Sequence, residues 1–337
     1  MASLREIKDR IGSVRSTLKI TSAMKLVASA KLRKAQKAIE ALRPYERTLA
    51  EILAAVGPLR PGAPIARRPS SLPADAGTGF DGANPAAAEP SLLGASGADI
   101  TGPTAVVAIA SNSSLCGGFN ANVVRKALEA IRGCKDGVEV YPLGRKMVEA
   151  MRRAGYTADQ DYNDLVGHPS YEKSAALARR LAERYQRGEL AGVVLVYTRF
   201  VSASKQEAIA EQYLPFGGIP DQVGDDEKSS FAGCRGPRKS SIFGVALTGE
   251  SPAANDYILE PDAEALAAQL LPQVMMLKFH AAILDSAAAE QAARTIAMQT
   301  ATDNAEDLLG ELTLEYNKGR QQKITAEILD LLGGSAN

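Results

Sequence analysis

The chain has 337 residues, 45% of them hydrophobic, and its 39 Lys and Arg are matched by 39 Asp and Glu. This length and apolar content allow one large domain or two ordinary domains with a genuine core. The three cysteines are too few and too far apart for a disulfide framework or a zinc site, which favours a reducing cytoplasm. No apolar run reaches the ~18 residues that span a bilayer, and no signal peptide is visible, so we expect membrane contact only through a partner.

The charges are not spread evenly along the chain. Residues 1–60 hold 13 basic and 5 acidic side chains, whereas residues 261–337 hold 5 basic and 11 acidic ones. Chain ends of opposite charge attract each other and also attract outside partners. We therefore expect a basic N-terminal arm and an acidic C-terminal arm.

The N-terminal segment, residues 1–57, has the pattern of one long helix. Ser3 and Glu6 fit a capping box at its start, Pro44 is expected to kink it, and Gly57-Pro58 ends it. Apolar side chains recur at alternating steps of three and four, the period of a left-handed coiled coil that needs a partner helix. The predicted seam consists of Leu4, Ile7, Ile11, Val14, Leu18, Thr21, Lys25, Ala28, Leu32, Ala35, Ile39, Leu42, Glu46, Leu49, Leu53 and Val56.

Residues 10–37 within this helix contain eight Lys and Arg and no Asp or Glu. Such charges are compatible with a solvated helix face, nucleic-acid phosphates, lipid headgroups or an acidic protein. No aromatic residue for base stacking lies between 1 and 44, and the apolar face is a narrow seam rather than a broad lipid-binding face. An acidic protein surface is the favoured partner.

The middle of the chain falls into two segments. Residues 58–103 are rich in Pro, Gly, Ala and Ser without periodicity, which predicts a disordered or loosely packed insertion. Residues 104–260 alternate strands and helices, which predicts a mostly parallel sheet covered by helices, with a polar loop at 221–253. Strands are expected at 104–111, 138–142, 191–200, 201–216 and 255–260, and helices at 121–131, 145–154 and 171–186.

The C-terminal segment, residues 261–337, is predicted to form a second long helix. Pro261 suits its first turn, Gly333-Gly334 ends it, and its Ala-rich seam is broken by Gln291 and Arg294. Because both terminal helices need a partner and their charges are opposite, we expect them to pair antiparallel. The predicted seam contains Leu266, Leu270, Leu277, Leu284, Ala287, Met298, Ala301, Ala305, Leu308 and Leu312.

Catalytic chemistry has few candidate residues. The segment LCGGFN at 115–120 lies between a strand and a helix but matches no phosphate-binding pattern, which favours a structural turn. Cys116 is interpreted as a packing residue, because only His168 and His280 are available as bases. Cys234 has no second cysteine nearby, so no local dithiol switch is expected. We expect no catalytic residue, no metal and no cofactor; a dinucleotide-binding α/β enzyme with helical arms and a basic coiled-coil nucleic-acid binder remain alternative hypotheses.

Long stretches of the chain resemble the gamma subunit, the central rotor shaft of F-type ATP synthases. They are KITSAMKLVASAKLRKAQ with RPY, SLCGGFNANV, EQAARTIAMQTATDNA and LTLEYNKGRQQKITAEI. The chain departs from the family at SNSS before LCGG, at Gln299 and Gly319, and in the insertions 58–103 and 221–253. The resemblance implies an antiparallel coiled coil of the N- and C-terminal helices with a central Rossmann-like α/β domain.

The same resemblance implies partners and a setting. In this family the coiled coil lies inside a hexamer of three alpha and three beta subunits, and the base contacts the epsilon subunit and the c-ring. Rotation of the c-ring, driven by proton flow, is transmitted to the catalytic beta subunits. The chain is thus expected to be a non-catalytic subunit on the cytoplasmic face of the bacterial inner membrane, with no nucleic-acid partner and membrane contact only through other subunits.

Four groups of site residues follow from the resemblance, position by position. The contact with the acidic lever of the beta subunit comprises Met24, Lys25, Gln291 and Arg294. The polar catch on the beta subunit comprises Arg320, Gln321, Thr325 and Glu327. The apolar bearing tip comprises Ile324, Ile328, Leu331 and Leu332. The foot on the c-ring comprises Tyr257 and Glu260.

Overall fold

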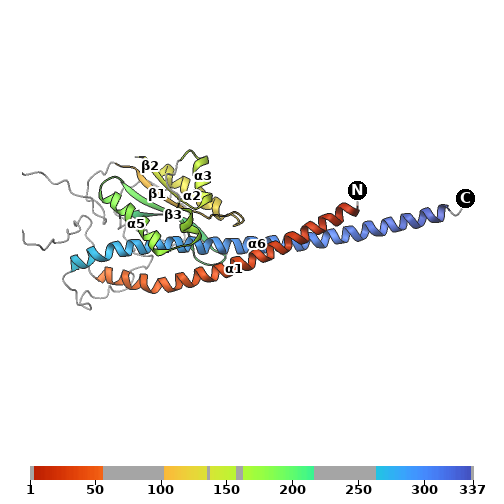
Figure 1. Ribbon diagram of the computed structural model, residues 1–337, viewed down its shortest axis with the longest axis horizontal. Coiled ribbons are helices and arrows are strands. Elements are labelled where there is room, and N and C mark those ends of the chain that lie inside the picture. Colours follow the sequence, from red (N-terminus) through yellow and green to blue (C-terminus); the bar gives the residue numbers. More distant parts are fainter. Residues whose placement is uncertain (1–3, 56–101, 135–136, 157–161, 216–262, 335–337) are drawn as a thin grey trace, which may run out of the picture. The chain divides into compact units, whose positions relative to one another are not determined.

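The computed structural model describes residues 4–55, 102–134, 137–156, 162–215 and 263–334 (Figure 1). The predicted insertion at 58–103, except its last two residues, lies outside the described residues, as do the loop at 221–253 and the strand at 255–260. The contacts divide the chain into two compact units. Unit 1 comprises residues 1–34, 115–117 and 290–337, and unit 2 comprises residues 35–114 and 118–289.

Two long helices contribute to both units. Helix α1 runs from Leu4 to Ala55 and helix α6 from Ala263 to Gly334, close to the predicted segments. Each remains one continuous helix through an internal proline, Pro44 in α1 and Pro272 in α6.

Unit 2 contains a four-stranded sheet with the order β2-β1-β3-β4. Strand β1 (Thr104–Ile109) pairs in parallel with β2 (Val138–Leu143) on one side and β3 (Gly192–Phe200) on the other. Strand β4 (Gln206–Leu214) pairs antiparallel with β3 at the edge. The prediction of a mostly parallel sheet is confirmed.

Four shorter helices belong to unit 2. Helix α2 (Phe119–Gly133), helix α3 (Arg145–Arg153) and helix α5 (Tyr171–Gln186) match predicted segments. Helix α4 (Asn163–Gly167) was not predicted, because a helix of five residues carries no readable periodicity.

The sheet buries side chains on both faces, as parallel sheets do. Alternate residues of β1, namely Ala105, Val107 and Ile109, belong to one apolar cluster with α4, α5, α6 and the end of α1. The intervening Val106 and Ala108 are also buried, and α2 contacts β1, β3 and β4. Strand alternation thus separates two cores, one on each side of the sheet.

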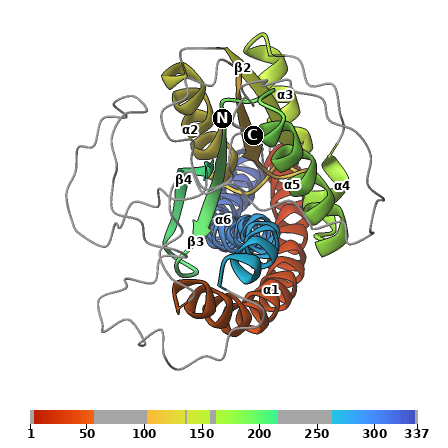
Figure 2. The same cartoon turned by 90° about the vertical axis from the view of Figure 1, so that its left-hand side faces the viewer.

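Helix α6 is enclosed in unit 2. Between Leu271 and Ala289 only Gln273 is exposed, since α6 lies between α1 and strands β3 and β4 (Figure 2). Phe279 is fully buried and packs edge-to-face against Tyr213 at 5.7 Å between ring centroids. The Tyr213 hydroxyl donates to the Met275 carbonyl at 3.0 Å, which ties β4 to α6.

In unit 1 the two long helices run antiparallel. The Thr302 Oγ1 donates to Thr21 Oγ1 at 3.1 Å, and a Cβ added at Gly319 would stand 3.1 Å from Leu4 Cδ2. From one contact to the other, the residue number in α1 falls while the residue number in α6 rises, so the two helices run in opposite directions. The predicted pairing of the terminal helices is confirmed.

The predicted seam of α1 is also confirmed. Every predicted seam position from Leu4 to Leu49 is buried or half-buried, whereas nearly all other α1 side chains are exposed. On α6 the seam is partly wrong: Leu308 is 45% exposed, and Leu309 is the half-buried residue at that turn. The observed α6 seam in unit 1 contains Met298, Thr302, Ala305, Leu309, Leu312, Tyr316 and Gly319.

Candidate functional site

The exposed surface of α1 in unit 1 has a second apolar strip that sequence reasoning missed. Ile20, Ala23, Val27 and Ala30 are all exposed and recur at steps of three and four, with Leu26 beside them. Their spacing is offset by two residues from the buried seam, and two residues are about 200° around a helix. The strip therefore faces away from α6, and the same offset in the sequence could have revealed it. We call these five residues the outer strip.

Basic side chains surround the outer strip. Lys19, Lys31, Arg33 and Lys34 are exposed. No ion pair joins any of them to a described acidic residue. An apolar strip bordered by cations is suited to a partner that offers apolar contact and carboxylates together.

Of the two residues predicted to contact an acidic lever, Met24 lies between the seam and the outer strip and Lys25 lies in the seam. Both are half-buried, and Lys25 occupies a seam position. A lysine there covers the seam with its aliphatic stem while its ammonium reaches the rim. The unbranched Met24 side chain is flexible enough to adapt to the shape of a partner.

Gln291 and Arg294, assigned to the same lever contact, lie in unit 1 with Met24 and Lys25. The Arg294 Nη1 is 2.7 Å from Glu290 Oε1, and both side chains are 9% exposed. Gln291 Nε2 donates to the same oxygen at 3.3 Å. Arg294 is thus paired with Glu290 of its own helix, and its predicted contact with another subunit stays a prediction.

The C-terminal end of α6 extends beyond the start of α1 in unit 1 (Figure 1). Every described side chain from Arg320 to Leu329 is exposed. The polar side chains of the predicted catch are therefore solvent-exposed, and Thr325 Oγ1 donates to Gln321 O of its own helix at 2.9 Å. Lys323 and Glu327 form a weak exposed pair at 3.8 Å.

The predicted bearing tip is described only in part. Ile324 and Ile328 are 44% and 51% exposed, and Leu329 beside them is 62% exposed. The side chains of Leu331 and Leu332 lie outside the described residues, although their backbone continues α6. Tyr257 and Glu260, assigned to the c-ring foot, also lie outside the described residues.

Hydrogen bonds to α2 and α4 hold the loop after β1 in place. Ser111 Oγ lies 2.9 Å from Asn120 Oδ1, and Asn112 Nδ2 donates to Asn163 O at 2.8 Å. Gly144 has a φ of +97°, and a Cβ there would stand 2.1 Å from Ala110 O, so the neighbouring loop packs against this one. Cys116 is buried. These contacts support the interpretation of LCGGFN as a structural turn.

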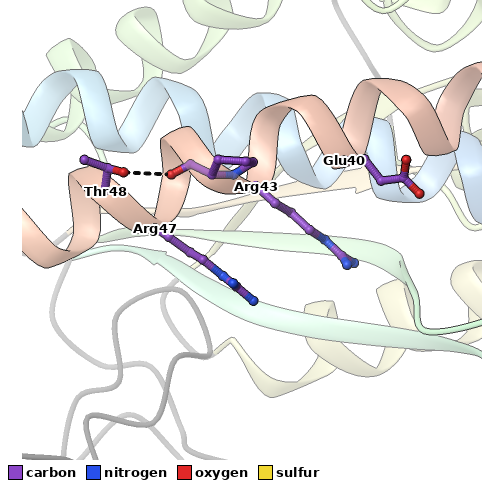
Figure 3. A pocket seen from close by; sticks show the side chains of 5 residues that line it. Glu40, Arg43, Arg47 and Thr48 are labelled. Atoms are coloured by element: carbon purple, nitrogen blue, oxygen red, sulfur yellow. Dashed lines mark hydrogen bonds between the residues drawn. The ribbon is translucent and has the colours of Figure 1, made fainter.

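A hollow of about 390 Å³ lies on α1 in unit 2, lined by Glu40, Arg43, Pro44, Arg47 and Thr48. The Arg43 and Arg47 side chains extend from α1 in the same direction (Figure 3). Thr48 Oγ1 donates to Pro44 O at 3.0 Å, and this bond supports the turn that contains the proline. None of these residues had been predicted as a site.

The comparison with known proteins identifies the family. The family model described as ATP synthase matches residues 3–337. Two relatives are the ATP synthase gamma chains of Bacteroides thetaiotaomicron, 42% identical, and Heliobacterium modesticaldum, 33% identical. The first alignment covers 99% of this chain and 99% of the relative, and the second covers 100% and 99%. The chain belongs to the ATP synthase gamma-chain family.

Solved structures share this fold. The chain is similar to one in the rotor of the Euglena gracilis mitochondrial ATP synthase, with a TM-score of 0.54, 17% identity, and coverage of 95% of this chain and 98% of that one. A second Euglena structure, of OSCP/F1/c-ring, gives a TM-score of 0.56 with 18% identity over 99% and 93% of the two chains. The predicted fold, two long terminal helices with a central α/β domain, is therefore confirmed.

Two further observations concern membranes and metals. Within the described residues no helix is both long and apolar enough to cross a bilayer. In the same part of this gamma chain no three His, Cys, Asp or Glu side chains are grouped so that they could hold a metal ion.

Proposed function

We propose that this gamma chain is the central rotor shaft of an F-type ATP synthase and has no active site of its own. Family membership assigns the chain to an ATP synthase, a membrane-associated complex. The observation that carries the mechanical role is the exposed end of α6, which continues past α1 with every described side chain from Arg320 to Leu329 solvent-accessible. A helix end with this much exposed apolar and polar surface is built for partner contact.

The helix pair of unit 1 supplies a body that resists twisting. Its seam is buried or half-buried along its length and contains a hydrogen bond between two threonines, which resists sliding of α1 along α6. A polar pair in a coiled-coil seam specifies register. Torque applied to one end of such a pair is passed along both helices together.

The outer strip and Met24 are the surfaces that we assign to the catalytic beta subunits. The exposed Lys and Arg around the strip attract carboxylates without fixing one geometry, which suits a surface that must slide. Because a rotating asymmetric surface meets each beta subunit in turn, it biases the nucleotide state of each through state-dependent contacts.

The remaining partners are part of the same proposal. The catch, Arg320, Gln321, Thr325 and Glu327, hydrogen-bonds beta-subunit loops in one rotational state. The tip formed by Ile324, Ile328, Leu331 and Leu332 turns within an apolar collar of the alpha3beta3 hexamer. Tyr257 and Glu260 contact the c-ring, with the epsilon subunit nearby. The complex places this chain on the cytoplasmic face of the bacterial inner membrane.

Co-purification tests this proposal. We expect the full chain, co-expressed with alpha and beta subunits, to be recovered in a stoichiometric complex with ATPase activity. Val27→Asp, within the outer strip, should lower ATP-driven rotation of the complex, because a new anion would face an acidic partner. Val201→Asp is the matched control, since Val201 is an exposed valine of unit 2 outside the strip. Failure of the chain to associate, or stoichiometric nucleotide binding by the chain alone, would contradict the proposal.

A further inference from the structure

Charged side chains from four elements of unit 2 gather between α1, α6, β3 and β4. Lys278 Nζ of α6 lies 2.7 Å from Glu211 Oε1 of β4, and each side chain is only 10% exposed. Tyr197 of β3 donates its hydroxyl to Glu211 Oε2 at 3.2 Å. Burying such a pair is costly unless its remaining atoms are also bonded, and the tyrosine meets part of that need.

Two more carboxyls join this pair. Glu46 occupies a seam position of α1 between Leu42 and Leu49, where coiled coils normally place an apolar side chain. Asp285 lies seven residues beyond Lys278 on α6, that is, on the same helix face two turns away. Glu46 and Asp285 are both half-buried and lie close enough to repel each other electrostatically.

The cluster therefore holds more anions than cations in its buried part. Lys278 pairs with Glu211 and also attracts Glu46, whereas the cations that act on Asp285 are Arg43 and Arg199. Arg43 of α1 and Arg199 of β3 also face the cluster, but both are exposed, so water screens their charges. A buried excess of carboxylate is relieved when one of the carboxyls takes a proton.

The acidities of the two carboxyls agree with this geometry. Burial raises the pKa of Glu46 to about 7, and repulsion by Asp285 adds to the rise, while Arg43 and Lys278 oppose it. Burial likewise raises the pKa of Asp285 to about 6, against the attraction of Arg43 and Arg199.

We propose that the Glu46–Asp285 cluster is a proton-dependent lock between α1 and α6 in unit 2. Uptake of a proton from solvent removes the repulsion between the two carboxyls and tightens the packing of the helices. Loss of that proton charges both carboxyls and weakens the packing. This proposal depends on the contacts of unit 2 and is independent of the rotor role.

The direction in which stability changes with pH follows from the pKa values of the two carboxyls in the folded and unfolded chain. The ordinary pKa of an unfolded Glu or Asp is about 4.3 or 3.9. Since the folded values are higher, the folded state binds more protons between about pH 4 and 7. The stabilising effect of the cluster is thus fully present below about pH 4 and is lost as the pH rises through about 6 to 7.

The test compares the full chain with three variants by urea unfolding at a series of pH values. Relative to Glu46→Gln, the unfolding equilibrium constant of the unmodified chain should rise by up to about tenfold for each pH unit between about pH 5 and 7, the effect of one linked proton. Glu40→Gln is the matched control, because Glu40 lies on the same helix but is exposed. It should keep the full pH dependence.

A second variant, Glu46→Leu, keeps the test decisive if the Glu46→Gln variant folds poorly. Leucine suits the seam between Leu42 and Leu49, so this variant should be at least as stable as the unmodified chain at pH 8 and should lose the same pH dependence. The lock is refuted if Glu46→Gln keeps the pH dependence of the unmodified chain. It is equally refuted if the variant is less stable by the same factor at every pH, since Glu46 would then be a permanently ionised partner of Arg43 or Lys278.

Discussion

The same helix, α6, meets two very different environments in the two units. In unit 2, from Leu271 to Ala289, it is buried on nearly all sides by the sheet and α1. In unit 1, from Met298 to Gly319, only one seam is buried, and from Arg320 to Leu329 no described side chain is. One segment of α6 is therefore core, the next is half of a coiled coil, and the last is free surface.

Under the proposed function, this gradient assigns stability to one part of α6 and partner binding to another. An enclosed helix loses stability with almost any truncation, because each side chain fills space on its own side of the axis. A helix buried along one seam tolerates change on its other faces, which leaves those faces available for recognition. Stability and recognition are thus separated along the length of α6 rather than between different elements.

The largest expected effect lies in the enclosed segment. Phe279→Ala should lower the free energy of unfolding by about 3–5 kcal/mol, because it opens a cavity against Tyr213 in a fully buried site. Leu312→Ala in the seam of unit 1 is the matched truncation and should cost about 2 kcal/mol, since its neighbours can relax toward solvent. Urea unfolding of the full chain measures the change in the free energy of unfolding for each variant. Equal changes would show that the two segments of α6 do not differ in how strongly their buried side chains stabilise the fold.

A charge placed beside the outer strip should affect coupling rather than folding. Met24→Lys adds a cation that strengthens attraction to an acidic beta-subunit surface, and an exposed ion pair is worth up to about 1 kcal/mol. A contact that must break in each cycle would then break up to about fivefold more slowly. ATP-driven proton pumping of the assembled complex should fall more than ATP hydrolysis, with Met24→Leu as the control. Equal loss of both activities would argue against the assigned contact.

The threonine pair gives a smaller effect that is specific to the seam. Replacing either Thr21 or Thr302 by valine should cost about 1 kcal/mol, the usual value of one buried hydrogen bond. The double variant should cost less than the two single changes together, because the bond between them is lost only once. A double-mutant cycle by urea unfolding measures the difference, and strict additivity would show that the two hydroxyls do not interact.

The smallest effect on stability is expected at the free end of α6. Leu329→Ser should change the free energy of unfolding by less than about 0.5 kcal/mol, because its side chain is exposed. The same change should weaken recovery of the chain with alpha and beta subunits if this end is a bearing. A large loss of stability would mean that the end of α6 packs against the chain itself.

Much of this fold could be predicted from spacing alone, and α1 shows why. From Leu4 to Leu18 only polar residues and one glycine stand between the seam positions, so only one register of the pattern fits there. In α6 both Leu308 and Leu309 are apolar, and steps of three-four or four-three both connect Met298 with Leu312. Only the packing of α1 decides between them, and it favours Leu309.

The site was predictable to a lesser degree. Residues at the end of α6 were assigned from motifs and the described ones are exposed, whereas the outer strip was overlooked because the buried seam already accounted for the helical period. The Glu46 cluster could be seen only as an odd carboxyl in the seam. Lys278, Glu211 and Asp285 come from distant segments, and their proximity depends on how the sheet packs against α6.

Gly319 has a consequence for the thickness of the helix pair. The half-buried glycine gives up about 1 kcal/mol of helix preference relative to alanine, yet it stands where a Cβ would press on Leu4. The backbone of α6 can thus pass close to the first turn of α1, and any larger residue at position 319 would have to displace the Leu4 side chain.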